Sequence, residues 1–390
     1  MNTIWFDVTT SFKWRRPAVG IIRAEKEVGK YLIKSTCTKL EFCIYDNKSN
    51  LYYKINKSIA ANLLADEFSD VSENIQDVKI CEANFEKNDV YMTMGLDWDH
   101  KDYEQLYRIK KTKCFKVVTF CYDLIPVIFP HYCVGDVAAM FAKYFVSLAW
   151  VSDHVLCISH NTNSDFDNLI HKLGAITPPS SVIKLGCNIK NIDAHDISPI
   201  IAKLICKKYI LFVSTIDRRK NHEVIYRALT RIADRRGEIP HVVFVGMQGW
   251  GVENLMKDIE LDPRTREYIT ILNNISDNEL VILYKNSQFT VYPSLYEGWG
   301  LPIAESLAYG KYCLASNTSS IPEVGGDLIE YLDPYDVNRW SHRLENLSQN
   351  TEVLKEMEKS IKNNYAPISW DETGANVFDV ILSLFHSDHD

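Results

Sequence analysis

The chain has 390 residues, of which 46% are hydrophobic and 24% are charged. This composition excludes disordered, collagen-like and coiled-coil chains, and the length favours two domains of roughly 150–200 residues each. The formal net charge of -8 argues against a dedicated nucleic-acid-binding protein, because phosphate contacts need concentrated Lys and Arg. Aromatic residues make up 12%, a weak hint of sugar binding, since flat apolar rings suit sugar faces, although protein cores also use such rings.

Compartment signals are few. The first residues, MNTIWFDVTTSFKWRR, lack the basic start and apolar stretch of a secretory signal. No uncharged apolar run reaches the roughly 18 residues that a membrane-spanning helix needs. The ten cysteines form no CxxC pair or metal-ligand spacing, and the histidines are scattered, so we expect reduced thiols and no metal site. We expect a cytoplasmic protein, with contact at the inner face of a membrane left open.

Apolar runs of strand length alternate with helix-length segments in the first half of the chain, which predicts a parallel sheet wrapped by helices. The expected strands are residues 4–8, 90–94, 115–122, 155–159 and 182–185. The expected helices are residues 18–33, 136–150 and 161–172. Residues 124–135 contain two prolines and indicate a strand exit and a loop.

Residues 187–207 show little pattern and are predicted to link two domains. The alternation then restarts, with expected strands at 209–214, 242–245, 268–272, 289–292 and 312–315. The expected helices are residues 222–232, 252–259, 278–284 and 302–309, then a helical tail from 337 and a last helix at 370–385. Ser276 and Glu279 have capping-box spacing. The result is two α/β halves, in which ligands bind outside the carboxyl ends of the strands.

The most informative motif runs from Tyr292 to Glu305, in the letters YPSLYEGWGLPIAE. A strand ends near Tyr292, and a tight loop with Gly298 and Gly300 leads into a helix, so the amides of Gly300 and Leu301 are expected to form an anion site suited to phosphate. Two carboxylates beside a phosphate cradle, Glu297 and Glu305, would repel the phosphate itself. They fit a ligand with hydroxyls on either side of it, as in a nucleotide sugar.

The segment EGWGLPIAE, with its Glu-x7-Glu spacing, resembles the signature of the retaining glycosyltransferases of family four, and the resemblance spans nearly the whole chain. It implies the α/β GT-B fold: two Rossmann-like domains with parallel sheets facing a central cleft. It also implies an acceptor-binding domain at 1–190, a nucleotide-sugar-binding domain at 191–365, and a helix at 366–390 that returns to the first domain. A surface helix cap with two solvated glutamates is the bland alternative.

A second motif, STIDRRKNH, follows the first strand of the second half. It looks like the family's RKN loop, in which a basic pair grips the donor diphosphate, and Arg219 and Lys220 are the matching positions. Alone, such a charge run would be a solvated turn; beside the glutamate motif, the phosphate-binding interpretation is preferred.

The first half contributes weaker candidates. In the family, a glycine after the first strand lets the backbone approach the donor phosphates; Gly20 and nearby Arg23 match, although a simple strand-to-helix turn explains them equally well. Asp123 matches an acidic residue of the family, but Tyr122 stands where many relatives carry His, which puts a histidine-based role in doubt. His160 is interpreted as an exposed residue at a helix cap.

The family chemistry implies departure of a nucleoside diphosphate, with the new charge stabilised by Arg219, Lys220 and the helix amides. Glu297 would hold the transferred sugar and Glu305 the ribose, while backbone near Ile275 would read the base. Asp123 completes the candidate catalytic residues. Since the two cations would neutralise the phosphates, we expect neither a divalent metal nor a cofactor.

The donor and acceptor stay open at this point. The segments WFDVTTSFKWRRPAVGIIRAE and STIDRRKNH look most like bacterial enzymes that use GDP-mannose in O-antigen or capsule assembly, which favours mannose transfer to a glycan or lipid-linked acceptor. A UDP-hexose or dTDP-rhamnose donor is the alternative within the same chemistry. A non-catalytic glycan-binding protein of GT-B shape is the alternative of another class, and the intact glutamate and basic pairs argue against it.

Overall fold

The computed structural model describes residues 2–14, 20–35, 38–68, 71–133, 135–187 and 197–386. The chain divides into two compact units. Unit 1 comprises the described parts of 1–130, 135–186 and 368–390, and unit 2 those of 131–134 and 187–367. The predicted boundary at residue 190 lies outside the described residues, and the predicted start of the last segment, residue 366, falls just before residue 368, where the chain re-enters unit 1.

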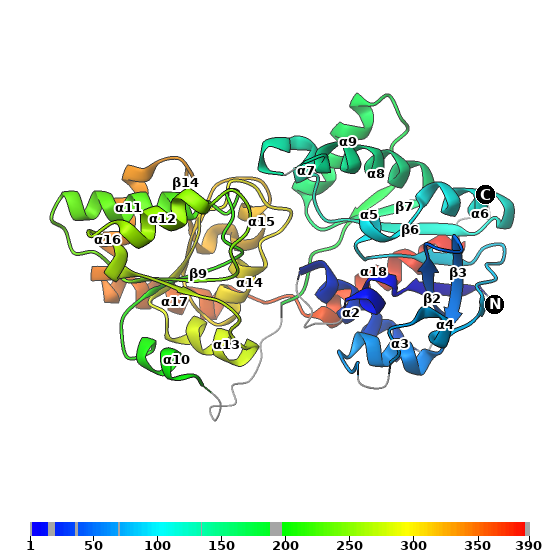
Figure 1. Cartoon of the computed structure of the whole chain (residues 1–390), viewed down its shortest axis with the longest axis horizontal. Helices are drawn as coiled ribbons and strands as arrows, with labels where there is room; N and C mark the ends of the chain where they lie inside the picture. Colours follow the sequence, from blue (N-terminus) through cyan, green and yellow to red (C-terminus); the bar gives the residue numbers. More distant parts are fainter. Residues whose placement is uncertain are drawn as a thin grey trace. The chain divides into compact units, whose positions relative to one another are not determined.

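Unit 1 is an α/β layer structure with helices on both faces of one sheet; α2, α3 and α18 cover one face, and α6, α8 and α9 the other (Figure 1). Its described strands are β1 Thr3–Asp7, β2 Lys39–Asp46, β3 Leu51–Ile55, β4 Lys79–Glu82, β5 Val90–Met92, β6 Lys116–Cys121, β7 His154–Cys157 and β8 Ser180–Val182. Its described helices are α1 Thr9–Lys13, α2 Gly20–Lys34, α3 Lys57–Leu64, α4 Ile75–Val78, α5 Asp97–His100, α6 Tyr103–Lys113, α7 Ile125–Ile128, α8 Val137–Val151, α9 His160–Lys172 and α18 Trp370–His386, with a 3-10 turn at Pro130–Tyr132.

The sheet of unit 1 is mixed, which corrects the expectation of a wholly parallel sheet. In the described residues its strand order is β4-β3-β2-β1-β5-β6-β7-β8. The five pairs from β2 to β8 are parallel, whereas β3 runs antiparallel to both β2 and β4. Four residues join β2 to β3, and a connection this short can form only an antiparallel hairpin. The sequence analysis predicted no strand between residues 34 and 90, where β2, β3 and β4 lie.

Unit 2 contains a wholly parallel sheet in the described residues, with the order β11-β10-β9-β12-β13-β14. The strands are β9 Ile210–Val213, β10 Val242–Val245, β11 Ile269–Leu272, β12 Phe289–Tyr292, β13 Cys313–Ser316 and β14 Glu330–Leu332. The helices are α10 Pro199–Leu204, α11 His222–Asp234, α12 Glu253–Leu261, α13 Asp277–Asn286, α14 Leu301–Ala308, α15 Ile321–Gly325, α16 Val337–Gln349 and α17 Thr351–Asn364, with 3-10 turns at Arg266–Tyr268 and Gly326–Leu328. Strands β10, β12 and β13 are buried along their whole length, as expected for a parallel sheet covered on both faces.

Two further predictions need correction. The region predicted as an unpatterned linker contains α10, whose Ile201 and Leu204 are buried in the core of unit 2. The strand predicted at 182–185 is displaced: β8 ends at Val182. Ile183 and Leu185 are buried although they lie after the end of β8. Their apolar character is therefore explained by burial and not by membership of the strand.

Candidate active site

The order of the strands in unit 2 locates its ligand-binding edge. The chain leaves the central strand β9 for β10 and β11 on one side, and then crosses back to β12 on the other side. The loops after β9 and β12 therefore diverge at a topological switch point, where open α/β sheets bind their ligands. A backbone hydrogen bond from Leu295 N to Arg219 O, 2.8 Å long, ties these two loops together.

The structure brings Arg219, Lys220 and Glu297 together at this switch point. The Glu297 carboxylate accepts from both cations: Oε2 lies 2.8 Å from the Arg219 guanidinium and Oε1 lies 2.6 Å from Lys220 Nζ. Arg219 also donates to Tyr296 O at 2.7 Å, and Lys220 to the Tyr292 hydroxyl at 3.0 Å. The two motifs singled out in the sequence therefore form one charged cluster.

This cluster is partly buried and carries one net positive charge. Glu297 itself is buried, with only 7% of its surface exposed. Burial acts to raise the pKa of Glu297, but the charges of Arg219 and Lys220 outweigh it and lower that pKa to about 2. Burial and the neighbouring Arg219 lower the pKa of Lys220 below its usual value. Within the described residues, two of the three Lys220 ammonium protons have acceptors, so one is available to a ligand.

The start of α14 lies beside this cluster. Gly300 is the N-cap residue, with a φ of 136°, and Trp299 and Gly300 are both buried. In the described part of the chain, the backbone N–H groups of Gly300 and Leu301 have no hydrogen-bond acceptor, as the phosphate-cradle hypothesis requires. Ser320 fixes the loop, because its hydroxyl donates to Glu297 O and Trp299 O, both at 2.9 Å. Gly298 is buried within the same loop.

The second glutamate of the motif, Glu305, contacts a tyrosine of α13. Glu305 is the fifth residue of α14, at the start of the second helical turn, and the helix begins at Leu301, one residue before the expected start at 302. Its Oε2 accepts from the Tyr284 hydroxyl at 3.1 Å, and the side chain is half-buried. Ile275 lies in the loop after β11, the edge strand of the sheet, and packs against the core of unit 2.

Asn221 and His222, next to the basic pair, were not assigned a role from the sequence. Asn221 has a φ of 61°, and its amide donates to Pro293 O at 3.1 Å and to Pro334 O at 2.9 Å. It therefore joins three loops at this edge of the sheet. His222 is buried and stacks on Phe212 with ring centroids 4.0 Å apart; burial and the charge of Lys220 lower its pKa to about 3, so it is a neutral packing residue.

The weaker candidates of unit 1 differ in their surroundings. Gly20 begins α2 with a φ of 51°, and a Cβ atom there would meet no other atom within 4 Å. The backbone conformation therefore favours glycine, although there is room for a larger side chain. Arg23 is half-buried in the first turn of the same helix. Asp123 caps the turn after β6 by accepting from Ile125 N at 3.0 Å. Tyr122 is buried, and its hydroxyl donates to Met94 O at 2.7 Å, so it is a structural residue.

A buried polar network at the carboxyl ends of β1 and β5 was missed entirely. Lys101 Nζ lies 3.0 Å from Asp7 Oδ1 and 2.7 Å from Asp97 Oδ1, with all three side chains almost completely buried. Burial acts to lower the pKa of Lys101, yet the two carboxylates raise it above its usual value. Tyr91 and Tyr103 donate to the same carboxylates. The i,i+4 spacing of Asp97 and Lys101 is the one local signal that could have indicated this network.

Two kinds of feature are absent from the residues that the structure describes, which run from 2 to 386 with the gaps given above. Nowhere in those ranges do three or more His, Cys, Asp or Glu side chains gather as a metal site. No helix in the described part of the chain combines the length and apolar character needed to cross a bilayer.

Comparison with known families agrees with the motifs at this edge of the sheet. Residues 197–365 match the family described as glycosyl transferases group 1, a segment that contains both glutamates and the basic pair. This segment belongs to that family. The resemblance drawn from the EGWGLPIAE and STIDRRKNH motifs is thereby confirmed.

Curated relatives of this chain include bacterial mannosyltransferases. The serotype-specific mannosyltransferase WbdA of Escherichia coli is 26% identical over 286 residues, which cover 70% of this chain and 34% of that protein. The O-antigen chain mannosyltransferase B of Escherichia coli is 35% identical over 158 residues, covering 39% of this chain and 41% of that protein. The matches thus span about a third to two fifths of these relatives' length.

Solved structures share the fold over the whole chain. Sucrose-phosphate synthase from Thermosynechococcus elongatus is 14% identical, with a TM-score of 0.66 and full coverage of both chains. A glycosyltransferase from Rickettsia africae is 17% identical, with a TM-score of 0.60 and 99% coverage of both. HepE from Anabaena, solved with UDP and glucose, is 12% identical, with a TM-score of 0.59 and coverage of 98% and 100%. These neighbours confirm the α/β GT-B fold class, with α18 packed on α2 of unit 1.

Proposed function

We propose that this chain is a retaining hexosyltransferase that moves mannose from GDP-mannose to a glycan or lipid-linked acceptor in surface polysaccharide synthesis. The observation that carries the proposal is the cluster of Arg219, Lys220 and Glu297 at the switch point of unit 2, beside open helix amides. The mannosyltransferase names of the relatives WbdA and mannosyltransferase B favour mannose.

The cluster suits a diphosphate leaving group. The net positive charge, the available Lys220 proton and the N–H groups of Gly300 and Leu301 would meet the negative charge that develops as the sugar departs. Removing one such preorganised donor typically costs a few kcal/mol of transition-state stabilisation. With Glu297 already ion-paired, the incoming phosphates would share the two cations with it, and the carboxylate would stay close to the transferred sugar.

The glutamates would have separate roles in this reaction. Glu297 would accept hydrogen bonds from hydroxyls of the sugar, and Glu305 would accept from the ribose, in competition with Tyr284. Ile275, Gly298, Gly20 and Arg23 are retained as donor-binding candidates and Asp123 as a catalytic candidate. No metal or cofactor is part of the proposal, because the protein's own cations would neutralise the phosphates.

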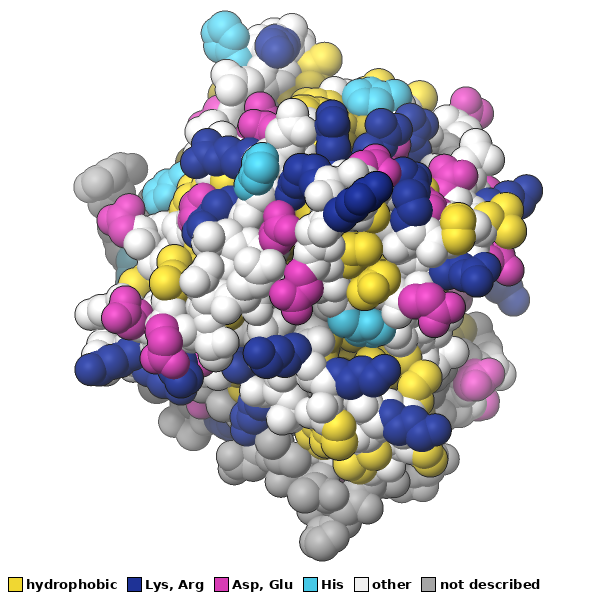
Figure 2. All heavy atoms as spheres, turned by 90° about the vertical axis from the view of Figure 1, so that its left-hand side faces the viewer, with side chains coloured by type: hydrophobic (Ala, Val, Ile, Leu, Met, Phe, Trp, Pro, Cys, Tyr) yellow, Lys and Arg dark blue, Asp and Glu magenta, His cyan; other side chains and the backbone are white. Residues whose placement is uncertain are grey.

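Polyanionic partners are not part of the proposal. The net charge is -8, and on the face of unit 2 that Figure 2 presents, basic and acidic side chains are interspersed among the described residues instead of forming a basic stripe. A lipid-linked acceptor would place the reaction at the inner face of a membrane, which a soluble glycan acceptor would not require.

Donor binding and transfer test this proposal directly. GDP should raise the melting temperature in the presence of EDTA, and GDP-mannose should give mannose transfer to a mannose-containing acceptor. UDP or dTDP stabilising the protein where GDP does not would move the assignment to the UDP-hexose or dTDP-rhamnose alternative. Activity abolished by EDTA and restored by Mg²⁺ or Mn²⁺ would refute metal independence.

Lys220→Ala identifies the site within the chain. It should lose about 10²-fold in transfer while the fold persists. Lys207→Ala, which removes an exposed lysine at the opposite end of β9, serves as the matched control. Binding of GDP-mannose without any transfer, to any of a panel of mannose-containing acceptors, would favour the non-catalytic alternative.

A further inference from the structure

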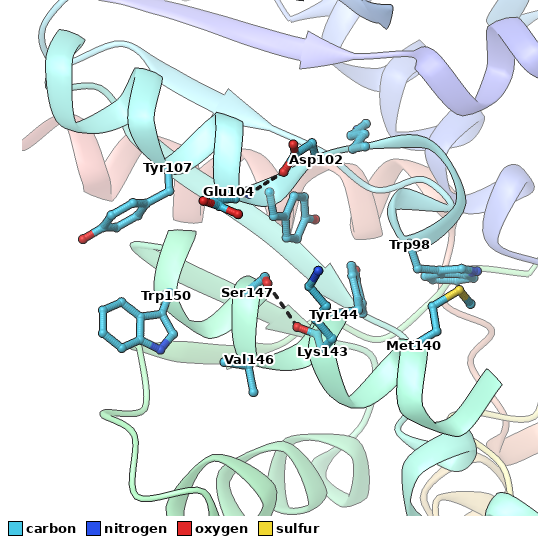
Figure 3. Close-up of a pocket in the computed structure, with 12 residues that line it drawn as sticks. Trp98, Asp102, Glu104, Tyr107, Met140, Lys143, Tyr144, Val146, Ser147 and Trp150 are labelled. Carbon is cyan, nitrogen blue, oxygen red and sulfur yellow. Dashed lines mark hydrogen bonds between the residues drawn. The ribbon is translucent and has the colours of Figure 1, made fainter. Parts of the chain in front are cut away.

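A groove on unit 1, between helices α6 and α8, has no part in the function proposed above. It is a cavity of about 560 Å³, within the range typical of small-molecule sites. Figure 3 shows Tyr107 and Trp150 at one end, Trp98 and Met140 at the other, and Lys143 and Ser147 between them. We call this feature the α6–α8 groove.

One aromatic ring of this groove is unusually accessible, and two others are partly buried. Trp150 is 63% exposed, although a tryptophan is normally mostly buried. Its ring lies 6.4 Å from that of Tyr107, at an interplanar angle of 78°. At the other end, Trp98 packs against Phe141 with centroids 4.9 Å apart, which holds its ring in place. Flat rings fixed at both ends of a groove suit ligands with apolar faces.

Hydrogen-bonding groups of both kinds lie between the rings. Asp102 caps α6 through Oδ1, which accepts from Glu104 N at 2.9 Å, and its Oδ2 has no donor in the described residues. The exposed Lys143 ammonium has no carboxylate partner there either. Ser147 donates to Lys143 O at 3.1 Å, which leaves its oxygen able to accept. The groove thus offers an acceptor, a donor and a hydroxyl to one ligand.

The charges select an uncharged ligand. A phosphate or an anionic lipid surface would meet the carboxylate of Asp102, and a cationic ligand would meet Lys143; the carboxylate of Glu104 is paired with Arg108. A chain of neutral hexoses has both the apolar ring faces that stack on Trp and Tyr and the hydroxyls that pair with the polar groups.

We propose that the α6–α8 groove binds a neutral oligosaccharide segment of the acceptor glycan, at a site distinct from the charged cluster of unit 2. This inference rests on the proposed function for the identity of the sugar. It would hold a growing polymer on the enzyme between successive transfers, through the stacking rings of Tyr107, Trp150 and Trp98.

Calorimetric titration of an α-linked mannose tetrasaccharide into the full chain, without nucleotide, tests the groove. The wild type should bind, and Trp150→Ala and Tyr107→Ala should each weaken binding about tenfold, as expected when an aromatic anchor is removed. Trp150→Phe should restore most of the affinity. Tyr268→Ala, which removes an exposed tyrosine of unit 2 (38% exposed), is the control and should bind as the wild type does.

Three results would overturn the inference. The wild type could fail to bind the tetrasaccharide, or Trp150→Ala could bind it as well as the wild type does. The third result would be binding to vesicles of phosphatidylethanolamine and phosphatidylglycerol that depends on Trp150, together with no binding of the tetrasaccharide. That result would make the groove a membrane contact. Because nucleotide is absent, failed transfer from GDP-mannose would refute the proposed function without changing this binding result, and failed tetrasaccharide binding would leave the proposed transfer intact.

Discussion

At Glu297 one buried carboxylate pairs with two cations, and this arrangement predicts an unusual variant. Glu297→Gln should lower transfer at least 10²-fold, because the carboxylate that faces the sugar is lost. It should bind GDP at least as tightly as the wild type, since Arg219 and Lys220 lose their internal anion. Breaking the buried pair should lower the free energy of unfolding by about 3 kcal/mol. Calorimetry with GDP and urea unfolding measure the two effects; weaker GDP binding in this variant would contradict the assignment.

Glu305 should behave in the opposite way. Glu305→Ala should weaken GDP binding by about 1.5–3 kcal/mol, the range for a hydrogen bond to a charged group. Tyr284→Phe is the matched control, because it removes the phenol that contacts Glu305 at 3.1 Å and keeps the carboxylate. If Glu305→Ala retains full GDP affinity while Glu297→Gln loses it, the roles of the two glutamates are reversed.

Glu25 makes stability depend on pH. It is completely buried, and its pKa is raised from 4.5 to about 7, chiefly by burial. Below pH 4.5 the carboxyl is protonated in both the folded and the unfolded state. Between pH 4.5 and 7 the unfolded state loses its proton first, so the free energy of unfolding falls as pH rises, by about 3 kcal/mol in all.

Glu25→Gln should remove this decline, and urea unfolding at pH 4.5, 6 and 7.5 measures it. Glu27→Gln, on the same helix with a partly exposed side chain, should keep the wild-type decline. A decline of equal size in Glu25→Gln would show that another group is responsible.

Individual site residues were predictable where a local motif marks them. The Glu-x7-Glu spacing and the basic pair identify Glu297, Glu305, Arg219 and Lys220 because each motif lies within one strand–loop–helix segment. The ion pairs among them were not predictable, since they join loops 77 residues apart. The same reason hid the Asp7–Lys101 contact, which depends on the register of the folded sheet.

At the scale of elements, Asn221 holds three loops of unit 2 together, and its contribution can be measured. Asn221→Ala should lose two hydrogen bonds to backbone carbonyls and a favourable left-handed residue. Asn88→Ala is the matched control, because Asn88 also has a positive φ, 68°, and its side chain makes no hydrogen bond in the described residues. The free energy of unfolding should fall by about 1–3 kcal/mol more for Asn221→Ala. Equal losses in urea unfolding would show that backbone conformation alone matters there.

Helices and strands were predictable where the apolar pattern is clear and loop residues mark both ends of the segment. The strands at 242–245 and 289–292 were predicted at their observed bounds, because short apolar runs lie between clear loop residues. The capping box of Ser276 and Glu279 is confirmed, with both reciprocal hydrogen bonds present. The β2–β3 hairpin was missed although its turn, Asp46 to Asn50, carries polar turn residues. Its strands are buried mainly by tertiary contacts with an aromatic core, and short segments of this kind lack a strong period of their own.

For the whole molecule, the two-unit organisation followed from the restart of the strand–helix alternation, but the return of the last helix to unit 1 came only from the family resemblance. No local pattern in residues 370–385 says which sheet they cover. The structure shows the physical basis: α18 packs on α2, and the Thr373 hydroxyl donates to Lys184 O at 2.9 Å, a contact 189 residues apart in the sequence.

The α2–α18 contact depends on a glycine. A Cβ atom at Gly374 would lie 2.4 Å from Tyr31 Cγ and 2.6 Å from Tyr31 Cβ, closer than packed atoms can approach. Gly374→Ala should therefore push the helices apart and lower the free energy of unfolding of unit 1 by about 1–3 kcal/mol, although alanine is the better helix former. Hydrogen exchange should rise in α2 and α18 and stay unchanged in the sheet of unit 2. Ser383→Ala, at an exposed position of the same helix, should leave exchange in α2 as in the wild type. If Gly374→Ala stabilised the protein, helix propensity would outweigh packing, and α18 would be held to unit 1 by contacts other than this close approach.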